Sequence, residues 1–172
     1  SRDGTRKYLL ALQDGELIES VYIPEADRST VCISSQVGCQ MGCTFCATGN
    51  MGFTRNLTAG EIVDQVLQVM LDVGSRPSNV VYMGMGEPLA NYDRLIESIK
   101  ILNAPWGLKI GIRQITVSTC GLVPGIRKLA KEGLGLTLAV SLHAADDEKR
   151  SRIMPVARVY SLEELLDALY EY

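Results

Sequence analysis

Three cysteines in one short segment are the residues of this chain best suited to chemistry. Cys39, Cys43 and Cys46 form a C-x3-C-x2-C pattern, and Gly38 and Gly42 let the backbone fold round them. A 4Fe–4S cluster is held by cysteine thiolates and normally takes four of them, one for each iron. Three neighbouring cysteines without an evident fourth predict a cluster with one open iron, at which a substrate can bind.

Other uses of these cysteines agree less well with the sequence. A structural zinc site takes four ligands, usually in pairs, whereas the remaining candidates Cys32, Cys120 and His143 are unpaired. Disulfide bonds are not expected, because the sequence shows no signal peptide and the cysteines crowd together. We therefore predict iron–sulfur ligation, with zinc as the alternative.

The composition describes a protein with one sizeable core. The chain has 172 residues, of which 47% are hydrophobic. No apolar run is long enough to span a membrane, so no membrane partner is expected. The net charge of −3 argues against broad nucleic-acid binding by this chain alone, although a local basic face is compatible with it. A thiolate-held cluster needs a reducing compartment, which predicts a cytoplasmic location.

Hydrophobic patterns predict the elements that must position the cysteines. Residues 7–12 and 16–23 flank the turn pair Asp14-Gly15, a pattern typical of a β-hairpin. Strands are expected over 30–35, 79–83, 112–118 and 136–142, and helices over 58–73, 91–102, 124–131 and from 161 onward. Capping boxes, Thr58 with Glu61 and Ser161 with Glu164, mark two of the helix starts.

Alternating strands and helices predict an α/β fold with parallel strands. About four β/α units are too few to close a barrel, so we expect a partial, TIM-like (β/α) barrel that is truncated. The expected division is a hairpin extension over 1–29 and a core over 30–172. In such folds the loops at the carboxyl ends of the strands form the active site, and the unusual residues of this chain fall in those loops.

Two of these loops carry groups that can bind a ligand. In the segment 84–88, Gly84 and Gly86 allow close approach to the backbone and Glu87 can accept a hydrogen bond from an ammonium or hydroxyl group; the same pattern also fits a tight turn. The segment 118–121 ends a strand. Its hydroxyl groups, Ser118 among them, can bind a ribose or a carboxylate, or only terminate the strand by local bonding.

Three further residues have both a structural and a functional interpretation. His143 is the only histidine and ends a strand after Ser141 and Leu142, where it can bond a ribose, a base or a phosphate. Cys32 is either a small buried hydrophobe or a thiol for redox or proton transfer. Glu19 is, by composition, a surface carboxylate on the hairpin.

Taken together, these motifs resemble one known family. The matching segments are 22–25, 31–39, 46–49, 55–58, 83–89, 118–121, 141–144 and 153–156. They resemble the dual-specificity ribosomal RNA and transfer RNA adenine-C2 methyltransferases, which are radical S-adenosylmethionine (SAM) enzymes. The match covers nearly the whole chain, in order.

The resemblance implies the fold and the cofactors. Residues 30–172 would form an incomplete radical SAM barrel, with a 4Fe–4S cluster and S-adenosyl-L-methionine as cofactors. Cys39, Cys43 and Cys46 would ligate the cluster. The positions that contact SAM in the family are matched by Gly86, Glu87, Ser118, Ser141, Leu142 and His143.

The resemblance also implies a reaction. The family methylates C2 of adenosine in 23S ribosomal RNA and in transfer RNA through a methyl-cysteine, and the covalent adduct resolves through a disulfide. Cys32 would remove the C2 proton, and Glu19 falls where the family has an acidic proton acceptor. The methyl-carrying cysteine lies in a C-terminal segment, and no cysteine follows Cys120 here. This chain alone is therefore expected to be inactive.

The implied partners are ribosomal and transfer RNA and an electron donor such as flavodoxin or ferredoxin, and the protein is expected to be a monomer. Three alternatives stay open. One is a radical SAM enzyme for another substrate. Another is a C8-adenine methyltransferase, although Pro88 favours the C2 branch because C8 enzymes usually carry Ala there. The third is a metal-stabilised binding module without catalytic activity.

Overall fold

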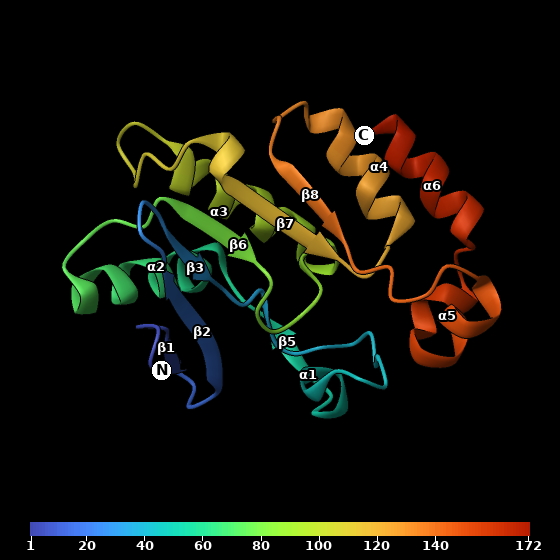
Figure 1. Ribbon diagram of the computed structural model, residues 1–172, viewed down its shortest axis with the longest axis horizontal. Helices are drawn as coiled ribbons and strands as arrows, with labels where there is room; N and C mark the ends of the chain where they lie inside the picture. Colours follow the sequence, from blue (N-terminus) through green and yellow to red (C-terminus); the bar gives the residue numbers. More distant parts are fainter.

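The strands of the chain form one twisted six-stranded sheet, with a second, two-stranded sheet beside it. The computed structural model describes all 172 residues (Figure 1). The order in the large sheet is β1-β2-β3-β6-β7-β8. Its strands are β1 (Arg6–Ala11), β2 (Leu17–Pro24), β3 (Ser29–Cys32), β6 (Asn79–Tyr82), β7 (Ile115–Thr119) and β8 (Thr137–Val140).

The pairing within this sheet confirms the expected architecture. The hairpin strands β1 and β2 are antiparallel, and β2 pairs with β3 in the antiparallel sense, so the hairpin extends the core sheet. β3, β6, β7 and β8 are all parallel to their neighbours. Four parallel strands joined by helices make an open, partial barrel.

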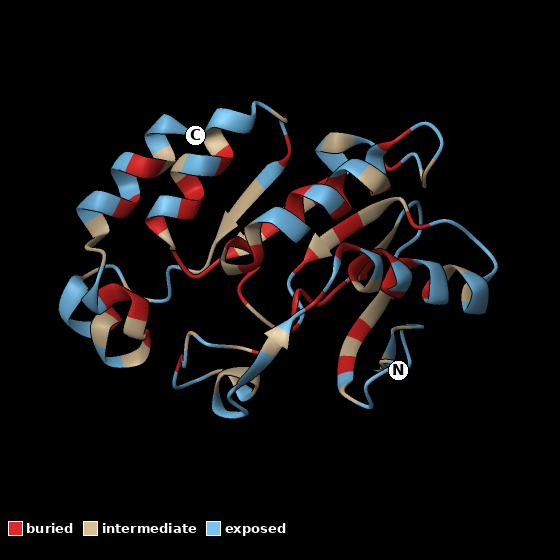
Figure 2. Ribbon diagram, turned by 180° about the vertical axis from the view of Figure 1, so that it is seen from behind, coloured by how far each residue is buried: buried red, intermediate tan, exposed pale blue.

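Helices cover one face of the sheet and bury its core. They are α2 (Ala59–Val73), α3 (Tyr92–Asn103), α4 (Val123–Glu132) and α6 (Leu162–Glu171), of which α2 packs on α3 and α4 packs on α6. The strand residues Val31, Val80 and Ile115 are fully buried together with helix residues such as Ile62 and Leu95. Figure 2 shows buried positions along the strands and on the helix faces that meet them. None of the helices combines the length and the apolar character needed to cross a bilayer.

Local capping sets the starts of two helices as predicted. Thr58 accepts a hydrogen bond from the Glu61 backbone N–H, and the Glu61 carboxylate accepts one from the Thr58 N–H. Ser161 and Glu164 make the same reciprocal pair at the start of α6. Both predicted capping boxes are therefore confirmed. The motif can be predicted from the sequence because its two hydrogen bonds join residues only three positions apart.

Several boundaries and short elements differ from the expectation. The strand expected over 112–118 begins at Ile115, because residues Ile112–Gln114 form a 3-10 turn, and the strand expected over 30–35 ends at Cys32. Six short elements lacked a sequence pattern: β4 (Gln36–Gly38), α1 (Ala47–Asn50), β5 (Phe53–Asn56), η1 (Pro88–Asn91), α5 (Asp147–Ile153) and η3 (Pro155–Arg158). Segments this short show no hydrophobic period and depend on tertiary contacts.

Arg55 joins the hairpin turn to the start of α2. Its Nε lies 2.7 Å from Asp14 Oδ2 and its Nη2 lies 2.8 Å from Glu61 Oε1. The Arg55 guanidinium is the main cause that lowers the pKa of the Glu61 carboxyl below its ordinary value of 4.5. The ion pair between Arg55 and Glu61 therefore stabilises the fold above the ordinary pKa of 4.5. This contribution is lost as the pH falls through the lowered pKa of Glu61.

Replacing Arg55 with Met is expected to reduce the free energy of unfolding at neutral pH by about 1 kcal/mol, as for a partly exposed ion-pair network. In urea melts, the variant should also lose less stability than the wild type on acidification. Arg94→Met, which removes an exposed partner of Glu97, is the matched control and should change little. If Arg55→Met keeps the acid sensitivity of the wild type, the pair does not stabilise the fold.

Candidate cofactor and active site

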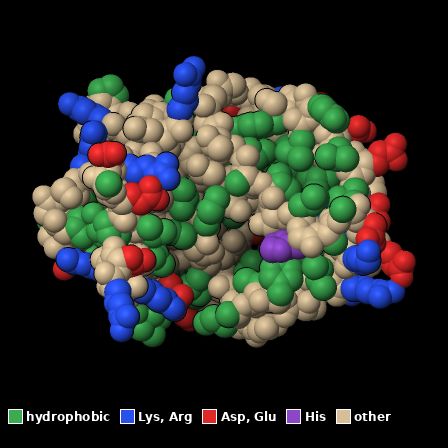
Figure 3. All heavy atoms as spheres, viewed as in Figure 1, with side chains coloured by type: hydrophobic (Ala, Val, Ile, Leu, Met, Phe, Trp, Pro, Cys, Tyr) green, Lys and Arg blue, Asp and Glu red, His purple; other side chains and the backbone are tan.

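A cavity of about 260 Å³ lies at the carboxyl ends of the parallel strands. Four loops line it, together with Met154 from the segment after α5 (Asp147–Ile153): the cysteine loop and those that follow β6, β7 and β8. Figure 3 shows the hollow beside the single histidine, with hydrophobic side chains around it. The lining residues that matter here are Cys39, Cys43, Phe45, Cys46, Gly86, Glu87, Ser118, Thr119, Cys120, Ser141, His143 and Met154.

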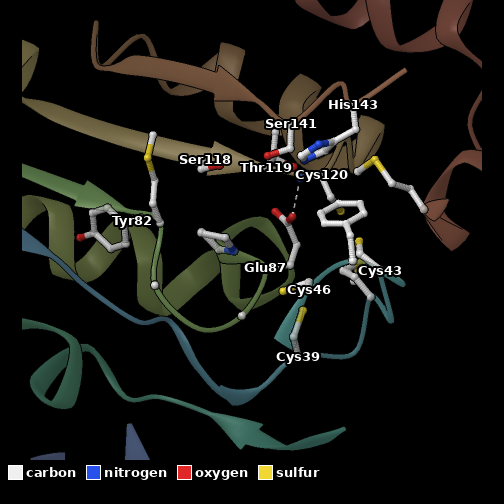
Figure 4. A pocket seen from close by; sticks show the side chains of 17 residues that line it. Cys39, Cys43, Cys46, Tyr82, Glu87, Ser118, Thr119, Cys120, Ser141 and His143 are labelled. Atoms are coloured by element: carbon white, nitrogen blue, oxygen red, sulfur yellow. Dashed lines mark hydrogen bonds between the residues drawn. The ribbon is translucent and has the colours of Figure 1, made fainter. Parts of the chain in front are cut away.

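The cysteine loop is fixed at its start and in its middle by backbone hydrogen bonds. At its start, β4 pairs with β5, and the Cys39 N–H donates to the Gly52 carbonyl at 2.8 Å. In its middle, the Thr44 N–H donates to the Ile153 carbonyl of α5 at 3.0 Å. Burial is the main cause that raises the pKa of the Cys39 and Cys43 thiols. The three thiols face Glu87 across the cavity (Figure 4).

The loop after β6 is bonded to the segment that precedes the cysteines. The backbone at Gly86 has a φ of +99°, and a Cβ atom there would lie 2.6 Å from Gln36 Cβ, so no other residue fits. The Gln36 side chain accepts from the Glu87 N–H at 2.9 Å and donates to Asn56 at 2.8 Å. Glycine is therefore required at position 86 because the Gln36 side chain packs against its backbone. The sequence alone did not predict a role for Gln36.

A second buried network of hydrogen bonds, centred on Ser34, also holds the loop after β6. The Ser34 hydroxyl donates to the Glu19 carbonyl at 2.7 Å and accepts from the Met85 N–H at 2.9 Å. The Gln65 side chain of α2 bonds both the N–H and the carbonyl of Ser34, and it accepts from Ser20. The hairpin, helix α2 and the loop after β6 are thus connected through one serine.

Glu87 is a buried carboxylate at the centre of the site. Its side chain is only 3% exposed; Oε1 accepts from the Leu89 N–H at 3.1 Å and Oε2 accepts from the Cys120 N–H at 2.8 Å. Burial raises the pKa of the Glu87 carboxyl, and these hydrogen bonds offset part of the rise. Glu87 therefore connects the loops that follow β6 and β7.

Replacing Glu87 with Ala is expected to lower the free energy of unfolding by about 2–6 kcal/mol, because two buried N–H groups lose their acceptor at about 1–3 kcal/mol each. Urea denaturation of the protein measures this. The control is Glu97→Ala on the exposed face of α3, which should stay within about 0.5 kcal/mol of the wild type. Equal stability of the two variants would contradict the structural role of Glu87.

The loops after β7 and β8 bring Ser118, Ser141 and His143 to the cavity. The Ser141 N–H donates to the Thr119 carbonyl at 2.9 Å, which ties the two loops together. His143 adopts a left-handed backbone with a φ of +59°, and its ring lies 4.2 Å from that of Phe45, centroid to centroid. A left-handed conformation is uncommon outside glycine and here places the histidine ring against the cysteine loop. Leu142 does not line the cavity, and it is 40% exposed.

Cys32 and Glu19 lie outside the cavity, on the sheet face that the helices leave uncovered. In the register, Val21 of β2 pairs with Cys32 and Cys32 pairs with Val81 of β6. Because side chains alternate along a strand, Glu19, Cys32 and Ser118 belong to the same face. Burial raises the pKa of the half-buried Cys32 thiol. The Glu19 carboxylate pairs with Lys7 at 2.6 Å.

The cavity also contains residues that sequence reasoning passed over. Thr119 and Cys120 lie in the 118–121 motif but carried no assigned role, and Met154 belongs to the matching segment 153–156 but was not predicted to line the site. Cys120 is a fourth thiol in the same cavity. Burial, followed by the charge of Glu87, strongly raises the pKa of the Cys120 thiol. Cys120 follows β7 and lies outside the cysteine loop, so it is not counted among the cluster ligands.

The donor set fits an iron–sulfur cluster better than a zinc ion. No three His, Cys, Asp or Glu side chains are placed to hold one metal ion between them. Zinc needs such convergence, whereas a 4Fe–4S cluster takes each thiolate on a different iron. Cys39, Cys43 and Cys46 face one cavity from a single loop and suit the second arrangement. Opposite them, Glu87 and the hydroxyl groups of Ser118 and Ser141 can bind an ammonium group, a carboxylate or a ribose.

Comparison with known proteins agrees with this geometry. Residues 33–172 match the family model of the radical SAM superfamily. The dual-specificity RNA methyltransferase RlmN of Syntrophobacter fumaroxidans is 56% identical over 99% of this chain and 50% of its own length. The probable dual-specificity RNA methyltransferase RlmN of Pelotomaculum thermopropionicum is 56% identical over 100% of this chain and 47% of its own length.

A solved structure is similar as well. The crystal structure of a radical SAM methyltransferase from Sphaerobacter thermophilus has a TM-score of 0.93 and 49% identity, and the match covers 98% of this chain and 50% of that one. The chain thus spans about half the length of the curated relatives it matches.

Proposed function

The chain belongs to the radical SAM superfamily, and from this premise we propose that it is the catalytic core of an enzyme that methylates C2 of adenosine in 23S ribosomal RNA and transfer RNA. The observation that carries the proposal is the convergence of the cysteine loop, Glu87 and His143 on one cavity. The identity to relatives named as dual-specificity RNA methyltransferases supports the choice of substrate.

Each residue of the cavity has a part in binding the cofactors. Cys39, Cys43 and Cys46 would hold the 4Fe–4S cluster. The backbone at Gly86, the Glu87 carboxylate, and the side chains of Ser118, Ser141 and His143 would contact SAM, with the backbone of Leu142 completing the loop. Phe45 and Met154 would exclude water from the cavity. When bound, the cluster and SAM supply the one-electron chemistry that an electron-poor carbon such as adenine C2 requires.

The uncovered face of the sheet would receive the adenine. Cys32 lies on that face beside the cavity, where its thiolate would take the C2 proton. Cys32 would then attack the sulfur of the methyl-carrying cysteine of the full-length protein, so that the disulfide forms as the bond between that sulfur and the transferred carbon breaks. Burial raises the pKa of the Cys32 thiol, so a neighbouring group would have to accept its proton. Glu19, on the same face, would serve as that acceptor once it is released from Lys7.

The proposal extends to the setting of the reaction. The hairpin of residues 1–29 would be an extension that carries Glu19, and residues 30–172 would carry both cofactors. Reduced flavodoxin or ferredoxin would supply the electron. The enzyme would act as a monomer in the cytoplasm, a reducing compartment in which the cysteine ligands are kept from oxidation.

The test uses the full-length protein, loaded with iron and sulfide under argon, with a chemical reductant, methyl-labelled SAM, and unmodified ribosomal or transfer RNA. Mass spectrometry of the digested RNA should find label at C2 of adenosine. Label at C8, or on no RNA at all, would contradict the assignment. A colourless protein that binds zinc in place of iron would favour a metal-stabilised binding module instead.

A further inference from the structure

Arg150 of α5 is a completely buried guanidinium without a counter-charge among the protein's own groups. Its exposed fraction is 0%, and its one hydrogen bond runs from Nη2 to the Cys120 carbonyl at 2.7 Å. Nε and Nη1 have no partner. No carboxylate forms an ion pair with it. A buried charge is costly unless it is paired, so such an arrangement requires an explanation.

The guanidinium lies directly behind the wall of the cysteine cavity. A Cβ atom on Gly121 would come within 2.7 Å of Arg150 Nη2, so the side chain lies against the backbone of the β7 loop. Four residues further along, Met154 lines the cavity and packs with Cys43 and Cys120 in one buried cluster. The same helix receives the hydrogen bond from Thr44 of the cysteine loop.

The one carboxylate that lines the cavity, Glu87, already has hydrogen-bond partners. Glu87 accepts hydrogen bonds from Cys120 and Leu89, and it reaches Cys120 through the N–H while Arg150 reaches it through the carbonyl. The guanidinium is left to the cysteine side of the wall instead, where Cys120, whose carbonyl it binds, packs with Cys43 in one buried cluster.

A 4Fe–4S cluster bound by three thiolates carries net negative charge, and it becomes more negative when it accepts an electron. We propose that Arg150 is the buried counter-charge of this cluster and that it raises the cluster's reduction potential by favouring the reduced state. This inference rests on the cluster of the proposed function. The step is the gain of one electron from reduced flavodoxin, or from dithionite in the test tube, and no bond is formed or broken. Arg150 would act on the cluster through the electric field of its positive charge, without binding to it.

The test compares three variants of the full-length protein, each reconstituted with iron and sulfide under argon. Arg150→Met removes the charge and keeps the side-chain length, whereas Arg150→Lys keeps a charge. Arg152→Met is the matched control, because Arg152 lies on the same helix with its side chain 70% exposed. Redox titration of the cluster, followed by its visible absorbance and by electron paramagnetic resonance, measures the potential.

At a fixed applied potential, Arg150→Met should show at least a tenfold lower ratio of reduced to oxidised cluster, which corresponds to a shift of about 59 mV to more negative potential for one electron. Arg150→Lys should recover most of this shift, and Arg152→Met should match the wild type. An intact cluster with unchanged potential in Arg150→Met would overturn the inference. A wild-type protein that loads no cluster would refute the proposed function instead.

The thermal stability of the metal-free protein distinguishes a counter-charge role of Arg150 from a role in holding the Cys120 carbonyl in place. Without the cluster, Arg150→Met should unfold at the same temperature as the wild type or higher, because the variant lacks an uncompensated buried charge. A clear fall in that temperature would mean that Arg150 serves to hold the Cys120 carbonyl, against the proposal. If Arg150→Met loses its cluster, retention in Arg150→Lys supports the charge role and loss in both variants overturns it.

Discussion

Replacing Cys43 with Ala is expected to abolish assembly of the 4Fe–4S cluster in the full-length protein and, with it, all methyl transfer. Cys43 is one of three thiols that face the cavity from one loop, and each would hold a different iron. Two remaining thiolates cannot hold the cube in place. Iron and sulfide content after anaerobic reconstitution, together with the brown colour of the protein, gives the measurement; Cys39→Ala and Cys46→Ala should behave alike.

Cys120 provides the matched control for this loss. It is also a buried thiol in the cavity, and it packs against Cys43. Because Cys120 follows β7 and is not part of the cysteine loop, it is not expected to be a ligand, and Cys120→Ala should keep its iron and sulfide. If this variant also loses the cluster, Cys120 is a fourth ligand. The cluster would then have no open iron, and the proposed site for SAM would be wrong.

Replacing Cys32 with Ala is expected to leave the cluster intact but to stop turnover and trap a covalent RNA–protein adduct. Cys32 lies on β3, away from the three ligating cysteines, so iron content should not change. Without its thiol the C2 proton stays in place and the bond between RNA and protein is not released. Denaturing gels of reactions with labelled RNA, followed by mass spectrometry of the retarded band, detect the adduct.

Two further variants sharpen this result. Cys32→Ser keeps the size of the side chain but cannot form a disulfide, so it should trap the same adduct. Val81→Ala removes bulk from the neighbouring position of β6 on the same face and should still turn over. Full activity of Cys32→Ala would mean that Cys32 is only a small buried residue of the sheet.

The cavity also explains why the cofactor residues are spread over the chain. Glu87, Cys120 and His143 follow three different strands, yet they meet because parallel strands end at one edge of the sheet. The loops are then connected directly, by Glu87 to Cys120 and by Ser141 to Thr119. A shift of one loop would therefore disturb the contacts of the others.

Features that depend on neighbouring residues were determined by the sequence itself. The spacing of Cys39, Cys43 and Cys46 places three thiols in one loop whatever surrounds it. The capping pair Thr58 and Glu61, and the apolar periods of α2 and α3, depend on residues three or four apart, which is why the alternation of strands and helices could be predicted. The partial barrel and the general position of the site followed from that alternation.

Only the tertiary structure decided which distant groups meet. It placed Glu19 and Cys32 on the uncovered face but outside the cavity, since strand register depends on pairing across the whole sheet. It also buried Arg150 against Gly121 and set Gln36 against Gly86. These contacts join residues about 30 to 50 positions apart, and no local pattern marks them, because side-chain packing selects such partners only once the chain has folded.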